Sequence, residues 1–116
     1  HGTTQCAISA AVVLDIESLA GEIAGLQAEG FLQDPKQLLV SDNCTVILPY
    51  HKALDQAREK SLSKEKIGTT GKGIGPAYED RASRRAVVFS DLFDKDLLRK
   101  KIERNLIEKN HLLANL

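Results

Sequence analysis

Two patterns of apolar residues alternate over the first forty residues: continuous apolar runs, and a run in which apolar residues recur every three or four positions. Residues 6–14 are almost all small and apolar, as in a strand buried on both faces. Asp15 follows as an N-cap residue, and residues 16–27 carry apolar side chains every three or four positions until Gly30, which indicates an amphipathic helix. Residues 37–41 read as a second buried strand. This spacing suits a right-handed crossover between parallel strands.

The second half of the chain predicts a short strand and several helices around one irregular stretch. Residues 44–48 are β-prone, and Pro49 stands at the first position of a polar helix that continues to about residue 61. Residues 63–76 lose all periodicity, and a long irregular stretch inside a compact domain usually has a function. The elements expected after it are a short helix over 78–85, an extended piece over 86–89 and a long helix opened by Asp94.

These elements predict an α/β fold, a fragment of a mostly parallel sheet with flanking helices and a long C-terminal helix. The 116 residues suffice for one domain, so we treat residues 1–116 as a single segment. Ligands in such sheets bind near the carboxyl ends of the strands, where we expect the irregular stretch to emerge.

Composition and charge narrow the possible functions. Hydrophobic residues make up 42% and charged residues 28% of the chain, an ordinary globular balance. The net charge is zero and aromatic residues make up only 4%, which argues against a nucleic-acid binder that stacks bases. Basic residues exceed acidic ones only in the second half, which gives that half some attraction for anions. No apolar run approaches the roughly 18 residues of a membrane helix.

The two cysteines lie in apolar, strand-like runs. Neither Cys6 nor Cys44 has a second cysteine or a histidine at metal-ligand spacing. We therefore expect two buried, reduced thiols in a cytoplasmic protein, and no metal site.

The residues that indicate chemistry gather in and just after the irregular stretch. Four glycines, Gly68, Gly71, Gly73 and Gly75, allow the backbone to come close to a ligand, and backbone amides in such a turn can converge on an anion. The same stretch supplies hydroxyls and positive charges, from Thr69, Thr70, Lys72, Arg84 and Arg85. The pattern indicates a phosphate or nucleotide site, but it matches neither a P-loop nor a dinucleotide fingerprint. A surface loop whose glycines only turn the chain remains the alternative.

Residues 68–80 read Gly-Thr-Thr-Gly-Lys-Gly-Ile-Gly-Pro-Ala-Tyr-Glu-Asp. This stretch resembles the motif of the adenylosuccinate synthetases, with Lys72 in place of the family's usual arginine. Residues 47–55 and 90–95 are also similar to the family's flanking segments, and the likeness extends from about Cys6 to the end of the chain.

The resemblance implies a function in purine biosynthesis. The family is a magnesium-dependent ligase that joins inosine monophosphate (IMP) and L-aspartate with hydrolysis of GTP. By position in the motif, Thr70 is implied to contact the IMP phosphate, with Thr69 beside it, and Lys72 and Gly71 are possible nucleotide contacts. Arg84 is implied to reach the IMP phosphate of the partner subunit in a homodimer. The resemblance places no catalytic residue and no metal ligand within the segment.

Several features of the family pattern do not occur in the segment. Its glycine-rich phosphate loop (Gly-Asp-Glu-Gly-Lys-Gly-Lys), its catalytic histidine and its guanine-recognition segment do not occur, and residues 9–11 read Ser-Ala-Ala where the family has Gly-Asn-Gly. We therefore expect an internal segment that is inactive alone and binds neither GTP nor Mg²⁺ by itself. The alternative is a non-catalytic interaction or dimerisation module on the same scaffold.

Some polar residues are expected to be structural. Glu79 and Asp80 have neighbouring opposite charges in Arg84 and Arg85, with which we expect them to pair. His51 is expected on a helix surface without a catalytic role. A basic group in the last helix is expected to form a solvated face, namely Arg99, Lys100, Lys101 and Arg104.

Overall fold

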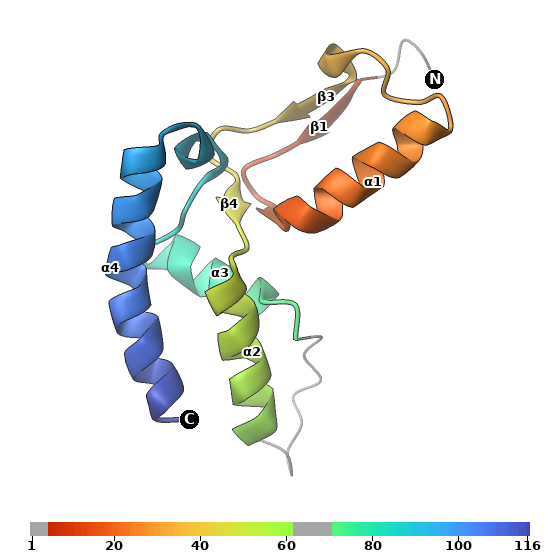
Figure 1. Cartoon of the computed structure of the whole chain (residues 1–116). Helices are drawn as coiled ribbons and strands as arrows, with labels where there is room; N and C mark the ends of the chain where they lie inside the picture. The colour runs from red at the N-terminus through yellow and green to blue at the C-terminus, as the bar shows by residue number, and fades with distance from the viewer. Residues whose placement is uncertain (1–4, 62–70) are drawn as a thin grey trace.

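The computed structural model describes residues 5–61 and 71–116, so the predicted site residues Thr69 and Thr70 lie outside the described residues. Figure 1 shows the arrangement of the elements within these ranges. In chain order they are β1 (Cys6–Ile8), β2 (Val13–Leu14), α1 (Ile16–Ala28), β3 (Leu38–Val40), β4 (Thr45–Val46), α2 (Pro49–Ser61), α3 (Ile74–Ala82) and α4 (Lys95–Ala114), with short 3₁₀ turns at Pro35–Gln37 and Phe89–Phe93. The α/β prediction is confirmed.

The strands form two parallel pairs. β1 pairs with β3, with Cys6 opposite Leu38, and β2 pairs with β4, with Leu14 opposite Val46. The single strand predicted over residues 6–14 is wrong, because a turn separates β1 from β2. Ser9 closes this turn: its carbonyl accepts from the Val12 N–H at 3.2 Å, and its hydroxyl accepts from the Ala11 N–H at 3.3 Å. Such local bonds compete with a strand ladder.

The part formed by β1, β3 and α1 is largely exposed. Asp15 caps α1 as predicted, accepting from the N–H groups of Glu17 and Ser18. No residue of α1 is buried, and Cys6 is exposed. The predictions of a doubly buried strand and of a buried Cys6 thiol are therefore wrong, because one helix beside a two-stranded sheet covers too little of it (Figure 1).

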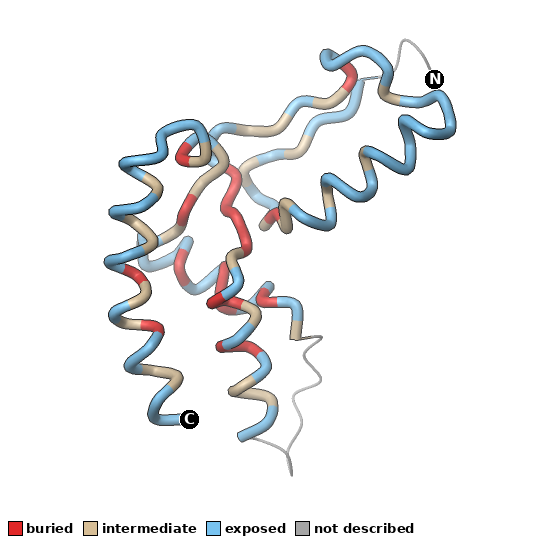
Figure 2. The backbone as a smooth tube through the Cα atoms, viewed as in Figure 1, coloured by how far each residue is buried: buried red, intermediate tan, exposed pale blue. Residues whose placement is uncertain are grey.

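The core lies between β4, α2, α3 and the return of the chain toward α4, as the buried positions in Figure 2 show. Residues 87–89, which lead back toward α4, are held beside β4 by backbone bonds from Val46 N–H to the Val87 carbonyl and from Phe89 N–H to the Cys44 carbonyl, both 2.8 Å. The buried hydrophobic residues among those described are Leu14, Cys44, Val46, Ile47, Tyr50, Leu54, Ala77 and Val87. The radius of gyration is 16.3 Å, against about 13 Å for a compact domain of this length.

The helices of the second half position the candidate site. α2 begins at Pro49 as predicted, and Asp94 caps α4 by accepting from the Leu97 N–H at 3.1 Å. α3 begins at Ile74, four residues before the prediction, and so starts inside the stretch predicted to be irregular. Pro76 lies in the first turn of α3, where its missing N–H costs no helical bond.

Candidate functional site

A turn of three residues, 71–73, leads into α3 and lies directly on α2; we call it the glycine turn. Gly73 has a φ of +82°, and a Cβ atom there would come within 2.9 Å of the backbone carbon of His51 and the backbone nitrogen of Lys52. Real side chains do not tolerate such contacts with backbone atoms. Only glycine therefore allows the chain to approach α2 this closely.

Two polar side chains of α2 hold the glycine turn. The Asp55 carboxylate accepts from the Gly73 N–H at 3.0 Å, and the Gln56 amide donates to the Gly71 carbonyl at 3.2 Å. Asp55 is 6% exposed and makes no ion pair with any described residue. The hydrogen bond to the turn thus offsets part of the cost of burying the Asp55 carboxylate.

Lys72 lies in the middle of the glycine turn and is exposed. No described residue forms an ion pair with it. Its positive charge is therefore accessible to an anion approaching from solvent. Gly71 is partly exposed beside it.

Arg84 follows the C-cap of α3 in the left-handed region, with a φ of +63°. That conformation costs a non-glycine residue roughly 1–2 kcal/mol. The side chain is exposed and makes no ion pair with the described residues. Helix geometry puts Arg84 about 16 Å along the axis from Gly73. The arginine and the glycine turn thus lie at opposite ends of α3.

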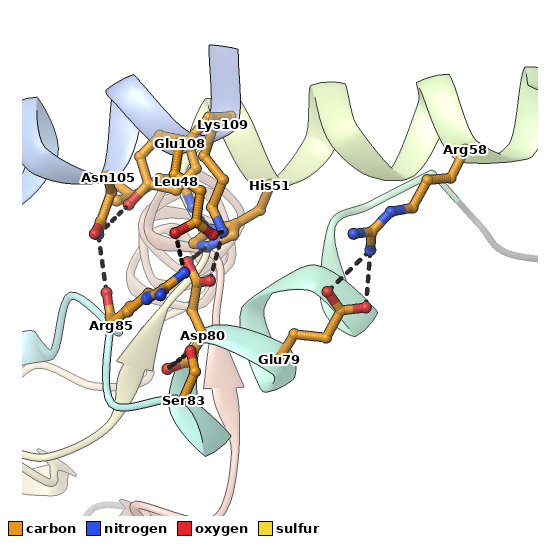
Figure 3. Close-up of polar contacts among 11 residues, drawn as sticks. Leu48, His51, Arg58, Glu79, Asp80, Ser83, Arg85, Asn105, Glu108 and Lys109 are labelled. Atoms are coloured by element: carbon orange, nitrogen blue, oxygen red, sulfur yellow. Dashed lines mark hydrogen bonds and ion pairs between the residues drawn. The ribbon is translucent and has the colours of Figure 1, made fainter. Parts of the chain in front are cut away.

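Three buried side chains, from three helices, meet beside the glycine turn; we call His51, Asp80 and Lys109 the charge cluster (Figure 3). The Asp80 carboxylate lies 2.7 Å from His51 Nε2 and 2.6 Å from Lys109 Nζ. His51 Nδ1 accepts from the Leu48 N–H at 2.9 Å, so the ring proton resides on Nε2 and points to Asp80. The cluster therefore joins α2, α3 and α4.

The charge cluster keeps Asp80 ionised. Burial acts to raise the pKa of Asp80, but the hydrogen bonds from His51 and Lys109 outweigh it and leave that pKa below the ordinary value of 3.8. The Asp80 carboxylate and the Lys109 ammonium thus compensate each other inside the protein.

A second set of contacts fixes α4 against the residue that follows Arg84. The Asn105 amide donates to the Tyr50 hydroxyl at 3.2 Å and to the Arg85 carbonyl at 2.8 Å. Burial raises the pKa of Tyr50, so this hydroxyl stays protonated. The backbone next to Arg84 is consequently tied to α2 and α4.

The structure corrects the predicted partners of the acidic pair after the motif. Glu79 pairs with Arg58 at 2.8 Å rather than with Arg84 or Arg85 (Figure 3). Asp80 points into the charge cluster, and Arg85 pairs with Glu108. Residues adjacent on α3 point in different directions, which sequence distance alone does not show.

The structure also corrects the expected environment of two other polar residues. His51 is fully buried rather than on a helix surface. In the basic group of α4, Lys101 is partly buried and pairs with Asp91 at 2.6 Å, while Arg99, Lys100 and Arg104 are exposed as predicted.

Side chains of α3 bind the turn over residues 9–12, which departs from the family pattern. The Tyr78 hydroxyl and the Arg81 guanidinium both donate to the Ala11 carbonyl at 3.1 Å. These contacts use a backbone carbonyl, which any residue at position 11 supplies. The turn thus keeps its position relative to α3 with the sequence Ser-Ala-Ala.

An open groove of about 380 Å³ lies at the carboxyl ends of β2 and β4. Its lining is largely apolar and includes Leu48, Pro49 and Leu92. Lys52 and Asp15 also line the groove and form an ion pair, with 2.8 Å between Nζ and Oδ2. No residue of the glycine turn lines this groove. Within residues 5–61 and 71–116, no cluster of histidine, cysteine or acidic side chains is suited to a metal ion. No helix in these ranges is apolar and long enough to span a membrane.

The fold and a comparison with known proteins identify the family of this chain. The parallel strand pairs and the helices beside them define an α/β protein with a glycine turn held against α2. The adenylosuccinate synthetase family model matches residues 1–116. The chain belongs to the adenylosuccinate synthetase family.

Curated relatives agree with this assignment, and a solved structure shares the fold. The chain is 66% identical over 112 residues to an adenylosuccinate synthetase from Bdellovibrio bacteriovorus, covering 97% of this chain and 26% of that protein. It is 53% identical over 116 residues to one from Francisella tularensis, covering 100% of this chain and 27% of that protein. The chain thus spans about a quarter of the length of these relatives. The structure of a fully ligated adenylosuccinate synthetase from Plasmodium falciparum shares the fold, with a TM-score of 0.83 at 22% identity over 98% of this chain and 26% of that one.

The predicted site residues are thus only partly brought together. Gly71 and Lys72 lie in the glycine turn, Arg84 lies at the far end of α3, and Thr69 and Thr70 fall outside the described residues. Sequence reasoning did not single out Asp55 or Lys109. Asp55 follows His51 by one helical turn on α2, a spacing that places both on the same face; nothing in the sequence marks Lys109 among the other basic residues of α4.

Proposed function

We propose that this chain is part of an enzyme that joins IMP and L-aspartate to adenylosuccinate, with GTP converted to GDP and phosphate. Its family membership and the motif over residues 68–80 support this activity. Within the enzyme, the segment supplies part of the IMP phosphate site and contacts between subunits. It is inactive alone.

The observation that carries the proposal is the glycine turn held from behind by α2. Lys72, in the middle of this turn, is exposed. Thr70 and Thr69 immediately precede Gly71 in the chain, and we propose that their hydroxyls donate to the IMP phosphate. Gly71 and Lys72 then contribute backbone polarity and positive charge to the same nucleotide site.

Arg84 is proposed to act on the partner subunit of a homodimer. It lies at the opposite end of α3 from the glycine turn of its own chain, and no described residue pairs with its guanidinium. In a twofold dimer each subunit presents the same arginine to the other. A guanidinium supplied to a phosphate forms strong charge-assisted bonds and links IMP binding to dimerisation.

GTP and Mg²⁺ are proposed to bind the whole enzyme rather than this segment. No residue of this segment is proposed as a ligand of the metal. GTP is a substrate in this scheme. The enzyme is proposed to act in the cytoplasm.

The proposal can be tested in a full-length chimera, in which this segment replaces the matching stretch of the Bdellovibrio bacteriovorus relative. Thr70→Val weakens the subunit's own site, and Arg84→Leu weakens the partner's site. If Arg84 acts across the dimer, mixing the two inactive variants regenerates one intact site in each mixed dimer, and activity recovers to roughly a quarter of the unsubstituted value.

Two results would contradict this proposal. A folded, dimeric chimera that forms no adenylosuccinate would favour the alternative of a non-catalytic dimerisation module. Mixed variants that stay inactive while subunits exchange would show that Arg84 does not serve the partner's site.

A further inference from the structure

We infer that Asn105 is a positioning residue for the Arg84 guanidinium, an inference that rests on the role proposed for Arg84 at the IMP phosphate of the partner subunit. Asn105 lies on α4 and is only 3% exposed, so it acts through other residues rather than on a ligand. It does so through residues 83–85, which we call the arginine turn. Asn105, Arg84 and the residues that join them all lie within the ranges that the structure describes.

The arginine turn closes the end of α3 with the hydrogen bonds of a Schellman motif. The Arg84 N–H donates to the Arg81 carbonyl at 3.2 Å, and the Arg85 N–H donates to the Asp80 carbonyl at 2.8 Å. Arg84, with a φ of +63°, occupies the left-handed position of the motif, which is usually a glycine. The two bonds fix the peptide units on both sides of Arg84, and with them the direction in which its side chain leaves the backbone.

Two features make this turn weaker than an ordinary Schellman motif. The left-handed conformation strains an arginine, whereas glycine adopts it freely. The motif is also commonly supported by a hydrophobic contact across the turn, but the positions that would form it hold Arg85 and the acidic residues Glu79 and Asp80. A strained conformation of this kind persists only where surrounding contacts hold it.

Asn105 holds the arginine turn from the interior of the protein. Its amide donates to the Arg85 carbonyl at 2.8 Å (Figure 3) and to the Tyr50 hydroxyl on α2 at 3.2 Å. A carbonyl can only accept, so the nitrogen of the Asn105 amide is the atom that faces Arg85. The other link to α4 is the ion pair of Arg85 with Glu108, whose side chains are 49% and 38% exposed. Such exposed pairs contribute little, so Asn105 is the principal anchor.

The anchor matters for the direction of an exposed guanidinium. Without it, Arg84 can return to a favoured backbone conformation with a negative φ, from which its side chain leaves in another direction. The guanidinium must then be ordered again whenever it binds a phosphate, which lowers the affinity of the partner's site for IMP. A glycine at position 84 would need no such support. The strained arginine and its buried anchor together therefore indicate a guanidinium held in one direction.

A double-mutant cycle in the full-length chimera tests the inference by steady-state kinetics. Asn105→Leu removes the amide with little change in side-chain size, and Arg84→Leu removes the group that the amide positions. We expect Asn105→Leu to raise KM for IMP about five- to tenfold, the factor that one lost hydrogen bond corresponds to, with KM for GTP unchanged. In the Arg84→Leu background the same substitution should change KM for IMP by less than about twofold, whereas a general loss of structure would act in both backgrounds.

Asn115→Leu is the matched control. The Asn115 amide also donates to a backbone carbonyl at 2.8 Å, that of His111, but it does so at the far end of α4. This variant should leave KM for IMP unchanged. If Asn105→Leu does not fold in the chimera, Asn105→Ser, whose hydroxyl is too short to reach the Arg85 carbonyl, takes its place under the same criteria.

Three results would overturn the inference. The first is an unchanged KM for IMP in the folded Asn105→Leu chimera. The second is an increase of the same size in the Arg84→Leu background, and the third is an equal rise in KM for GTP.

Failure of the inference is distinguishable from failure of the proposed function. If the chimera forms adenylosuccinate and Arg84→Leu raises KM for IMP, the role proposed for Arg84 stands whatever the Asn105 variants show. If Arg84→Leu leaves KM for IMP unchanged, or if the folded chimera is inactive, the proposed function has failed, and the inference with it.

Discussion

At the residue scale, two residues with positive φ angles lie at the two ends of α3. Gly73 takes a positive φ where no side chain fits, and Arg84 takes a positive φ although it carries a long side chain. The first is a steric requirement for the turn to lie on α2. The second costs roughly 1–2 kcal/mol; its backbone N–H donates to the Arg81 carbonyl at 3.2 Å, and its guanidinium makes no ion pair with the described residues.

Substitution of Gly73 tests the steric requirement. Gly73→Ala should destabilise α2 and α3 by about 2 kcal/mol or more, from the positive φ and the 2.9 Å contacts with backbone. Gly75→Ala is the matched control, because a Cβ there meets nothing within 4 Å and alanine favours the helix by up to about 1 kcal/mol. Hydrogen exchange of the α2 amides measures both. Equal protection in the two variants would contradict the close approach.

Substitution of Arg84 tests whether stability is given up at this position. Arg84→Gly should stabilise the end of α3 by up to about 1 kcal/mol, because glycine adopts this conformation without strain. In the chimera the same variant should lose IMP affinity. Protection of the α3 amides against hydrogen exchange gives the first effect and an IMP titration the second. A variant that loses stability would show that the arginine side chain contributes packing.

At the element scale, the charge cluster links three helices inside the core. His51, Asp80 and Lys109 come from α2, α3 and α4, and all three are nearly inaccessible to solvent. A buried charge pair adds little stability over an apolar pair of similar size, but its rupture is costly. The cluster therefore fixes the relative positions of the helices that carry the glycine turn and Arg84.

Removing one charge of the Asp80–Lys109 pair should destabilise the protein more than replacing both residues by apolar ones. Asp80→Asn leaves the Lys109 ammonium buried without its carboxylate and should destabilise the helices by about 3 kcal/mol. Replacing both residues by leucine should cost clearly less. Hydrogen exchange of the α4 amides provides the comparison. A double variant as unstable as Asp80→Asn would show that the unpaired charge is not the cause.

The depressed pKa of Asp80 gives a definite sign for pH dependence. The folded protein binds the Asp80 proton more weakly than the unfolded chain, so the contribution to stability is complete above 3.8 and is lost as the pH falls through the lower pKa of the folded state. Protection of the helical amides should therefore decline as the pH is lowered below about 4. Asp80→Asn should show a weaker decline. An equal decline in both would assign the effect to other carboxylates.

At the scale of the whole molecule, burial divides the chain into two unequal parts. The buried residues concentrate in β4, α2, α3 and the segment over residues 87–91, while α1 buries none (Figure 2). Large apolar side chains are exposed in both parts, among them Phe31 and Leu39 in the part with α1 and Phe93 and Ile107 in the part with α4. The part that contains the site is therefore the more stable one.

Hydrogen exchange of the 116-residue chain should resolve these two parts. Amides of β1, β3 and α1 should exchange well before those of α2 and α4, because few buried contacts oppose their local opening. The thermal melt of the chain should accordingly be broad. Uniform protection with one sharp transition would contradict this division.

The sequence allowed the α/β class, the parallel pairing and the helices at Pro49 and Asp94 to be predicted, because caps and hydrophobic periodicity are local signals. It did not show the break after Ile8, which depends on Ser9 bonding within its own turn. Nor did it show the charge cluster, whose partners are 29 residues apart in both of its pairs. Pairings at such separations depend on helix packing, which local patterns do not encode.

The central claim is that this segment holds the phosphate of IMP, and an IMP titration of the full-length chimera tests it most directly. We predict that the Thr70→Val, Arg84→Leu double variant binds IMP at least about a hundredfold more weakly than the unsubstituted chimera, since two phosphate contacts are lost. Its affinity for GTP should not change. Full retention of IMP affinity by the folded, dimeric double variant would contradict the claim.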